Sequence, residues 1–380
     1  MTNKEQNKLI GKIEGENLQR EATIIRPYFD KLVVTDPIIL FPDQWARLKG
    51  LSHEVVSAGE QASVDELYQH AMAENKPVCW TQLAAKPLQG KDLEHAVEGA
   101  DGIIACWTTI HDEVLNNPNL KYVGYWTNLA AHRINLDLAR QRGIHVDYVP
   151  DYGTHAVASQ TLTGILALLR NLPNELKMTR DGKWHFELLK TRQRVPLTED
   201  QIPQQDLWFK KVGVVGYGPI GEKVIELLKP WECDVSYWSR QRRPEVEKST
   251  GVVYKDLPEL FENSDIVSLH LNPYAGDGII SRDLIYRMKP GSVFVNTSAG
   301  GLVDQEALFE RLKSGEIRAY LDVYEGLPPK ADVRDLSAKG NLFTYRAGWF
   351  TRDAVRLKGE KFLQNMERFI ESRSQGTNES

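Results

Sequence analysis

A glycine-rich turn carries the clearest chemical signal in the sequence. Gly216, Gly218 and Gly221 follow the apolar run KVGVV at the spacing G-x-G-x-x-G, and the helical pattern PIGEKVIELL comes directly after. The first glycine permits a tight turn, the second lets a pyrophosphate approach the backbone, and the third lets helix and strand pack closely. Pro219 and Ile220 open the helix, whose free N–H groups would bind the phosphates. The turn therefore predicts a dinucleotide site; the alternative is a glycine-rich turn without a ligand.

The next β-rich run, DVSYWS, indicates which dinucleotide is bound. A carboxylate near position 239 would bind the ribose 2′-hydroxyl of NAD, but Ser239 stands there, followed by Arg240, Arg242 and Arg243. Guanidinium groups suit a 2′-phosphate through charge and bidentate geometry. The sequence therefore favours NADP(H) over NAD(H). The alternative is a basic loop in solvent, which would contribute little.

Composition excludes several classes of function. The 380 residues are 41% hydrophobic and 26% charged, with a formal net charge of -5, so nothing favours binding to nucleic acid or to an anionic membrane. Cys79, Cys106 and Cys233 are far apart and form no metal-binding motif, which suits a reducing compartment. The N-terminus has no secretory pattern, and no apolar run reaches the length of a membrane span. We therefore expect a cytoplasmic protein without a metal site.

Two series of alternating strands and helices follow a polar N-terminal stretch. Such alternation implies parallel sheets with flanking helices, hence an α/β fold with two domains. We expect an N-terminal polar arm at residues 1–32, which either packs on another subunit or frays. A substrate domain is expected at 33–170 plus 345–380, and a dinucleotide-binding domain at 171–344. The expected strands are KLVVTDPIILF, KPVCW, DGIIACW, KYVGYW and IHVDYV in the first series, and KVGVVGY, DVSYWS, VVYKD, DIVSLHLN, SVFVN and RAYLDVY in the second.

Several segments together carry a family resemblance. VGVVGYGPIG, SDIVSLHLNP and the stretch from MKPGSVFVNTSAGGLVDQ to RAYLDVYE are similar to the D-isomer-specific 2-hydroxyacid dehydrogenase family, which includes phosphoglycerate and formate dehydrogenases and glyoxylate reductases. The resemblance covers about residues 98–350 and is looser in the first half of the chain. The resemblance implies two Rossmann-like, doubly wound parallel-sheet domains, one flavodoxin-like and one dinucleotide-binding. It also implies an active site in the cleft between them, and a homodimer.

The family's three catalytic positions hold other residues here. Family members use an Arg in an N-x-x-R-G turn, a His in T-P-H, and a Glu before a Pro. In this sequence, those positions are Ala299, Arg346 and Leu327. Arg346 cannot shuttle protons as His does, because a guanidinium stays protonated in proteins, but it can orient or neutralise an anion. Oxidation of a 2-hydroxy acid by the family route is therefore not expected.

The cofactor positions of the family are retained. Asp322, in LDV, matches the Asp that contacts the nicotinamide amide. Thr297 and Ser298 match the flank of the cofactor, and His270 and Asn272 match the edge of the adenosine site. The alternative for each residue is a satisfied polar group of a loop.

Other side chains could supply the missing chemistry. Arg346 could activate the substrate, and Tyr345, His155 and His132 could donate a proton if their pKa values suit. The alternative for each is a surface or packing residue. Aromatic residues near the expected cleft suggest a bulkier ligand than lactate, unless they are core residues. They are Trp107, Tyr125, Trp126, Tyr345 and Trp349.

The sequence is compatible with three functional hypotheses. The first is an NADP(H)-dependent oxidoreductase with a rebuilt active site, which reduces a C=C, C=N or C=O bond of a small anionic or aromatic molecule. The second is a non-catalytic dinucleotide sensor or scaffold. The third is a nonredox enzyme that uses the bound dinucleotide.

Overall fold

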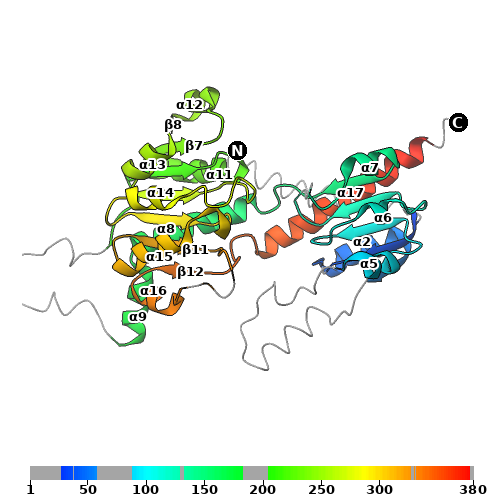
Figure 1. The fold of residues 1–380 in the computed structure, drawn as a ribbon, viewed down its shortest axis with the longest axis horizontal. Coiled ribbons are helices and arrows are strands. Elements are labelled where there is room, and N and C mark those ends of the chain that lie inside the picture. The colour runs from blue at the N-terminus through cyan, green and yellow to red at the C-terminus, as the bar shows by residue number, and fades with distance from the viewer. Residues whose placement is uncertain are drawn as a thin grey trace, which may run out of the picture. The chain divides into compact units, whose positions relative to one another are not determined.

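The chain forms two compact α/β units. The computed structural model describes residues 27–36, 38–57, 88–128, 132–182, 204–326, 329 and 331–376. Unit 1 comprises the chain up to Pro150 together with Val355 onward, and unit 2 runs from Asp151 to Ala354 (Figure 1). Within these ranges, no helix combines the length and the apolar character that a membrane span requires.

Unit 1 is built on a five-stranded parallel sheet in the order β2-β1-β3-β4-β5. The chain runs from β1 outward to β2 and then returns to the other side of β1 as β3, so the strand order reverses between β1 and β3. The carboxyl ends of all these strands lie at one edge of the sheet. The strands are β1 (Phe29–Val34), β2 (Ser52–Ser57), β3 (Gly102–Ala105), β4 (Tyr122–Tyr125) and β5 (His145–Tyr148).

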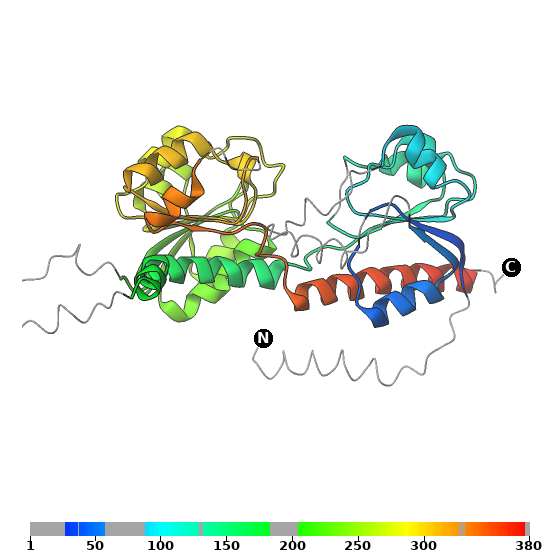
Figure 2. The same cartoon turned by 90° about the horizontal axis from the view of Figure 1, so that it is seen from below.

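Helices cover both faces of this sheet (Figure 2). On one face lie α2 (Pro42–Gly50) and α17 (Arg352–Gly376); on the other lie α5 (Gly90–Ala96), α6 (Asp112–Leu115) and α7 (Leu136–Gln141). Phe369 of α17 stacks on Phe29 and His145 of the sheet. Arg47 of α2 binds Glu360 and Glu367 of α17, so the two helices of the first face are tied together.

Unit 2 is built on a seven-stranded parallel sheet in the order β12-β11-β10-β9-β6-β7-β8. Helices α8 and α11 cover one face, while α13, α14 and α15 cover the other (Figure 2). The strands are β6 (Lys211–Val215), β7 (Asp234–Trp238), β8 (Val253–Tyr254), β9 (Ile266–Leu269), β10 (Val293–Asn296), β11 (Arg318–Leu321) and β12 (Leu342–Phe343). The helices are α8 (Thr154–Leu169), α9 (Leu172–Arg180), α11 (Pro219–Leu228), α12 (Pro244–Thr250), α13 (Leu257–Asn263), α14 (Arg282–Arg287), α15 (Gln305–Ser314) and α16 (Val333–Ala338).

The expected fold class is confirmed, but the domain limits differ from those expected at residues 170 and 345. Helix α8 belongs to unit 2 because it packs against α11, β10 and β11. The approach is close: a methyl group at Gly164 would lie 2.0 Å from the ring of Tyr320. The N-terminal arm and the strand expected at KPVCW lie outside the described residues. Strand β2 was missed because SHEVVS is mostly exposed and polar.

Candidate functional site

The glycine-rich turn of unit 2 has the geometry that a pyrophosphate requires. Gly216 has a φ of +108°, and a methyl group there would lie 2.5 Å from the carbonyl oxygen of His270. A methyl group at Gly221 would lie 2.0 Å from the carbonyl oxygen of Gly216, so helix and turn pack tightly. At Gly218, by contrast, a methyl group would meet nothing within 4 Å. Open space therefore adjoins the start of α11, where Pro219, which has no N–H, precedes the free N–H groups of Ile220 and Gly221.

His270 lies beneath this turn, at the end of β9. Its backbone N–H donates to Val215 O at 2.7 Å, and its Nε2 lies 2.7 Å from the Ser268 hydroxyl. Burial lowers the pKa of His270 to about 3, so the ring is neutral. Its Nδ1 is buried without a hydrogen-bond partner in the described part of the chain. Asn272 is exposed and accepts a hydrogen bond from Tyr274 N at 2.9 Å. His270 thus supports the turn, whereas Asn272 faces solvent.

The three arginines after β7 have different surroundings. Arg242 forms two hydrogen bonds with the carboxylate of Glu247, at 2.8 and 2.7 Å. Arg243 lies 5.4 Å from the centre of the Tyr217 ring, inside the glycine-rich turn, and Arg240 is exposed. Ser239 donates to Gln241 O. Arg242 is therefore neutralised locally, while Arg240 and Arg243 remain suited to an anion near the turn.

The turn after β10 is held by its own polar side chains. The Thr297 hydroxyl lies 3.0 Å from that of Thr161, and the Ser298 hydroxyl donates to Leu269 O at 2.7 Å. Ala299 is half-buried against the hydrophobic core. A methyl group at Gly300 would lie 1.9 Å from the backbone of Tyr324, so only glycine fits there. The turn is closely packed, and Ala299 contributes packing rather than charge.

Asp322 anchors the loop that carries Arg346. Its Oδ1 accepts from the Thr344 hydroxyl at 2.6 Å and from Ala347 N at 2.9 Å, while its Oδ2 accepts from Gly348 N at 3.0 Å. Its backbone oxygen accepts from Arg346 N at 2.8 Å. A carboxylate offers about four acceptor positions, so one position of Asp322 is not used by the described residues. This buried side chain therefore fixes the shape of the loop, in which Arg346 has a φ of 47° and is exposed.

Two tyrosines, the buried Tyr320 and the half-buried Tyr324, support the same loop. The Tyr320 hydroxyl accepts from Gln160 Nε2 at 2.8 Å and lies 2.9 Å from the Thr344 hydroxyl. The Tyr324 hydroxyl donates to Thr344 O at 2.8 Å, and the Tyr324 ring stacks on Tyr345 at 6.4 Å. Burial raises the pKa of Tyr320 and of Tyr324, so both are poor proton donors. Tyr345 is half-buried beside Arg346.

The structure brings together most of the expected unit 2 residues but not His132. His155 is exposed near the start of α8. Close to it, Tyr152 packs edge-on against Trp349 at 5.9 Å, so the loop after Arg346 contacts the start of this helix. His132 belongs to unit 1, as do Tyr125 and Trp126, which are buried and are therefore core aromatics.

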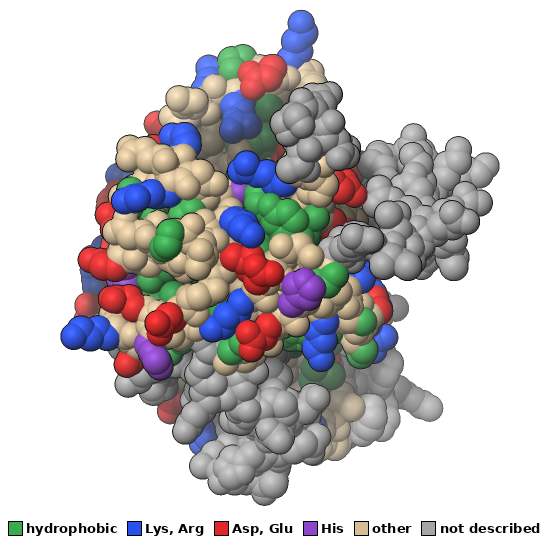
Figure 3. Space-filling view, turned by 90° about the vertical axis from the view of Figure 1, so that its right-hand side faces the viewer, with side chains coloured by type: hydrophobic (Ala, Val, Ile, Leu, Met, Phe, Trp, Pro, Cys, Tyr) green, Lys and Arg blue, Asp and Glu red, His purple; other side chains and the backbone are tan. Residues whose placement is uncertain are grey.

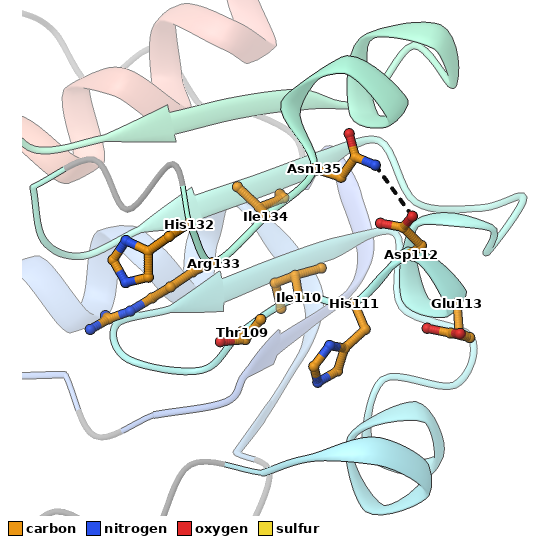
Figure 4. Close-up of a pocket in the computed structure, with 9 residues that line it drawn as sticks. All are labelled: Thr109, Ile110, His111, Asp112, Glu113, His132, Arg133, Ile134 and Asn135. Atoms are coloured by element: carbon orange, nitrogen blue, oxygen red, sulfur yellow. Dashed lines mark hydrogen bonds between the residues drawn. The ribbon is translucent and has the colours of Figure 1, made fainter.

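His132 lies beside a cavity of about 460 Å³ in unit 1 (Figure 4). His132 and Arg133 form one end, and an Asn135–Asp112 hydrogen bond of 3.2 Å closes the other. Arg133 donates to Cys106 O at 2.7 Å, which joins the loops after β3 and β4. No residue of the glycine-rich turn lines this cavity. Among the described residues, no group of three His, Cys, Asp or Glu could hold a metal ion.

Sequence reasoning missed a buried polar group of unit 1. Lys358 of α17 is 2% exposed, and its Nζ lies 3.5 Å from the centre of the Trp126 ring. Asp36 Oδ2 accepts from the backbone N–H groups of Cys106, Trp107 and Thr108 at 2.6, 3.1 and 3.0 Å. The sequence did carry a signal, because Lys358 occupies a position of the apolar stripe of α17.

Charges on the face shown in Figure 3 are mixed. Lysine and arginine side chains alternate with aspartate and glutamate over this face. A binding surface for a nucleic-acid backbone requires a basic stripe, which this face lacks.

The sequence is similar to known proteins over most of its length. Residues 162–344 match the model of the D-isomer specific 2-hydroxyacid dehydrogenase, NAD binding domain. The chain is 32% identical over 261 residues to a glyoxylate reductase of Thermococcus litoralis, covering 66% of this chain and 74% of that protein. It is 30% identical over 292 residues to a D-3-phosphoglycerate dehydrogenase of Methanocaldococcus jannaschii, covering 75% of this chain. There it spans only about half of the relative's length (53%).

A solved structure shares the fold over nearly the whole chain. This is an acyclic imino acid reductase, Bsp5, in complex with NADPH and D-Arg, with a TM-score of 0.66 and 21% sequence identity. The match covers 90% of this chain and 97% of that one.

Proposed function

Because this chain belongs to the D-isomer specific 2-hydroxyacid dehydrogenase family, we propose that it is an NADP(H)-dependent oxidoreductase that reduces a C=C, C=N or C=O bond of a small molecule. The observation that carries the proposal is the loop held by Asp322. This carboxylate fixes Arg346, at the position of the family His, beside residues that suit a nicotinamide.

Residues of unit 2 would hold the cofactor, which supplies a hydride when bound. The turn from Gly216 to Gly221 and the start of α11 would bind the pyrophosphate. Arg240 and Arg243 would bind the 2′-phosphate, since Arg242 is engaged by Glu247. The fourth acceptor position of Asp322 would receive the nicotinamide amide, beside Thr297 and Ser298.

Arg346 would orient an anionic group of the substrate beside the bond that accepts the hydride. A guanidinium binds such an anion but does not transfer a proton at neutral pH. The proton would come from Tyr345, His155, His132 or solvent. An imine that is already protonated needs no such donor in the reduction step. The absence of an imidazole at position 346 therefore favours C=N reduction among the three bond types.

The experiment is a turnover assay with matched cofactors. Oxidation of NADPH and of NADH by the purified chain would be followed against carbonyl, imine and enoyl compounds. We expect turnover with NADPH and an imine, and a loss of about 10- to 100-fold in Arg346→Ala. The Arg346→Lys variant keeps the positive charge but loses the paired N–H donors of the guanidinium, so it would recover part of the rate. Turnover of a carbonyl alone, unaffected by Arg346→Ala, would contradict the assignment of Arg346.

A second candidate is a non-catalytic dinucleotide sensor or scaffold. It is favoured by the turn after β10, where Ala299 packs on the core and the Ser298 hydroxyl is used internally. Tight binding of NADP(H) without turnover would support it. A nonredox enzyme would instead convert substrate while the amount of NADPH stays constant. If the chain binds neither NADPH nor NADH, all of these candidates fail.

We also propose that the protein is a cytoplasmic homodimer. Large apolar side chains that are exposed in unit 2 support the dimer, since such surface is often covered by a partner. Light scattering after size exclusion would give the mass, and a fluorescent fusion would give the location. The exposed side chains are Leu172, Leu176, Trp208 and Phe209.

A further inference from the structure

We propose that unit 2 carries a further ligand site, an acidic cavity that binds a linear polyamine with three ammonium groups. The cavity has a volume of about 1010 Å³, which lies at the upper end of the range of about 300–1,000 Å³ usual for small-molecule sites. No residue of the glycine-rich turn lines it, and neither Asp322 nor Arg346 does. The site is therefore separate from the proposed dinucleotide site, and its occupant need not be a substrate.

Three loops at the carboxyl ends of β9, β10 and β11 form this cavity together with α15 and the start of α14. The first two loops are joined through their backbones, since Gly278 N donates to Gly301 O at 2.8 Å. The third loop is packed against the second, because a methyl group at Gly300 would lie 2.2 Å from Glu325 N. Backbone contacts therefore fix the wall of the cavity.

Carboxylates outnumber cations on this wall. Two cations, Arg282 and Lys313, and five carboxylates line the cavity, which leaves an excess of three negative charges. Arg282 is already bound by Glu310, with hydrogen bonds of 2.7 and 3.1 Å. The cavity therefore favours a ligand with several positive charges. The five carboxylates are those of Asp277, Asp304, Glu306, Glu310 and Glu325.

Three of these carboxylates have no partner within the described part of the chain. The side chains of Asp277, Glu306 and Glu325 form neither a hydrogen bond nor an ion pair there. All three residues are exposed, so a ligand can reach them from solvent. Asp277 lies close to the second loop, since a methyl group at Gly301 would lie 3.4 Å from its Oδ1. Three carboxylates on three chain segments thus match three separate ammonium groups.

Gln305 adds a buried polar group to the same wall. It is the first residue of α15, it is 8% exposed, and it lines the cavity. Its side-chain amide forms no hydrogen bond with any residue that the structure describes. A buried amide without a partner is costly. An ammonium group in the cavity would donate to the amide oxygen of Gln305 and remove this cost.

The start of α15 excludes an anion from this site. A bare helix start favours an anion, because the free N–H groups and the positive end of the helix dipole lie there. Here Asp304 already accepts from Ala307 N at 2.9 Å, and Glu306 adds a second negative charge in the first turn. These two carboxylates would repel a phosphate and attract an ammonium group.

Apolar side chains complete the wall. Val303 and Phe309 are buried and Ala331 is half-buried, and all three line the cavity. Such surface suits the methylene chains that separate the amines of a polyamine. A metal ion is a poorer match, because no three His, Cys, Asp or Glu side chains in the described ranges come close enough to hold one. The cavity therefore favours an elongated organic cation.

Calorimetry on the full chain without NADPH tests the proposal, with spermidine as the ligand. We expect one spermidine per chain, weaker binding of putrescine, and a loss of affinity as the NaCl concentration rises. Glu306→Gln and Glu325→Gln should each weaken spermidine binding by about two- to fivefold. Gln305→Leu leaves the net charge unchanged and should weaken binding by about fivefold.

The matched control is Glu245→Gln. Glu245 is exposed and lies in the first turn of α12, as Glu306 does in α15, but it does not line the cavity. Spermidine binding should be unchanged in this variant. Equal losses in Glu245→Gln and Glu306→Gln would indicate a diffuse attraction by the net charge of the chain and would overturn the proposal.

The exposed positions keep the test decisive if Gln305→Leu does not fold, because Glu306→Gln and Glu325→Gln change only surface side chains. Failure of spermidine to bind the wild-type chain would overturn the proposal and would indicate that water alone fills the cavity. Binding of magnesium or of a tetralysine peptide in place of spermidine would also contradict it. The affinity for NADPH should be the same in Glu306→Gln and wild type, and a change would contradict the separation of the two sites.

Discussion

Asp322 Oδ2 accepts a hydrogen bond from the backbone nitrogen of Gly348 at 3.0 Å, and Gly348 lies two residues after Arg346 in the chain. The carboxylate and the chain segment that it binds are 26 residues apart, and no substrate is needed to explain the contact. Because the same side chain also binds Thr344 and Ala347, the position of Arg346 depends on Asp322.

Asp322→Asn therefore tests the role of this loop. The amide nitrogen of Asn donates and cannot accept, so at least one backbone N–H of the loop loses its partner. We expect kcat to fall by about 10- to 100-fold. Thr344→Val removes only the hydroxyl contact and is the milder control. If Asp322 served the cofactor alone, the affinity for NADPH would change and kcat at saturation would not.

The arginines after β7 allow a paired test of cofactor choice. Arg243→Ser should raise the KM for NADPH by about tenfold and leave the KM for NADH unchanged, because the 2′-phosphate is present only in NADPH. Arg242→Ser is the matched control, since Arg242 is already bound to Glu247. Steady-state kinetics with both cofactors measure the difference. Equal effects of the two variants would indicate a general change of the loop.

Two glycines of the same turn should respond differently to alanine. Gly218→Ala meets open space, so stability should be kept while dinucleotide binding is weakened by the methyl group. Gly216→Ala places a methyl group 2.5 Å from His270 O at a φ of +108°, and should cost about 2 kcal/mol or more in the free energy of unfolding. Urea unfolding and a dinucleotide titration separate the two effects. Loss of stability in Gly218→Ala would contradict the open geometry.

Lys358 predicts a pH dependence of stability. Its pKa is about 8 in the fold and 10.5 ordinarily, so between these values the unfolded chain holds the extra proton and stability rises with pH. Below pH 8 the fold bears the full cost of the buried charge, about 3 kcal/mol. The Lys358→Met variant does not bear this cost. The difference in the free energy of unfolding between the variant and wild type should therefore shrink as the pH rises from 8 to 10.5.

The neighbouring thiol of Cys106 also contributes to the pH dependence of stability. Burial raises the pKa of Cys106 to about 12, which has the opposite effect on stability above pH 9. Because both proteins contain Cys106, the difference between them isolates Lys358 to a first approximation. Urea unfolding at several pH values gives this difference, and a constant difference would contradict the shifted pKa.

The sequence allowed prediction of what depends on neighbours along the chain. Gly216, Gly218 and Gly221 lie within one strand–turn–helix unit, so their spacing alone indicated the phosphate site. The anchoring role of Asp322 could not be predicted, because its partners lie more than 20 residues downstream and act mainly through backbone atoms. Ala299 was identified only as a departure from a motif; its contact with the core required the structure.

The domain limits also could not be predicted from the sequence. The limit expected at residue 170 placed helix α8 in the first domain. Its contact with Tyr320 through Gly164 depends on tertiary packing, which composition does not reveal. Lys358 is the opposite case: its place among the apolar positions of α17 is visible in the sequence, although no prediction was made for it.

The left-handed backbone of Arg346 has a consequence for laboratory evolution. At a φ of 47°, a residue with a Cβ costs about 1 kcal/mol relative to glycine. A selection for heat resistance alone should therefore enrich Arg346→Gly and discard the guanidinium. A selection in which growth depends on the reaction product should restore the arginine at position 346. Opposite outcomes at one codon under the two regimes would mark position 346 as a residue retained for chemistry at the expense of the fold.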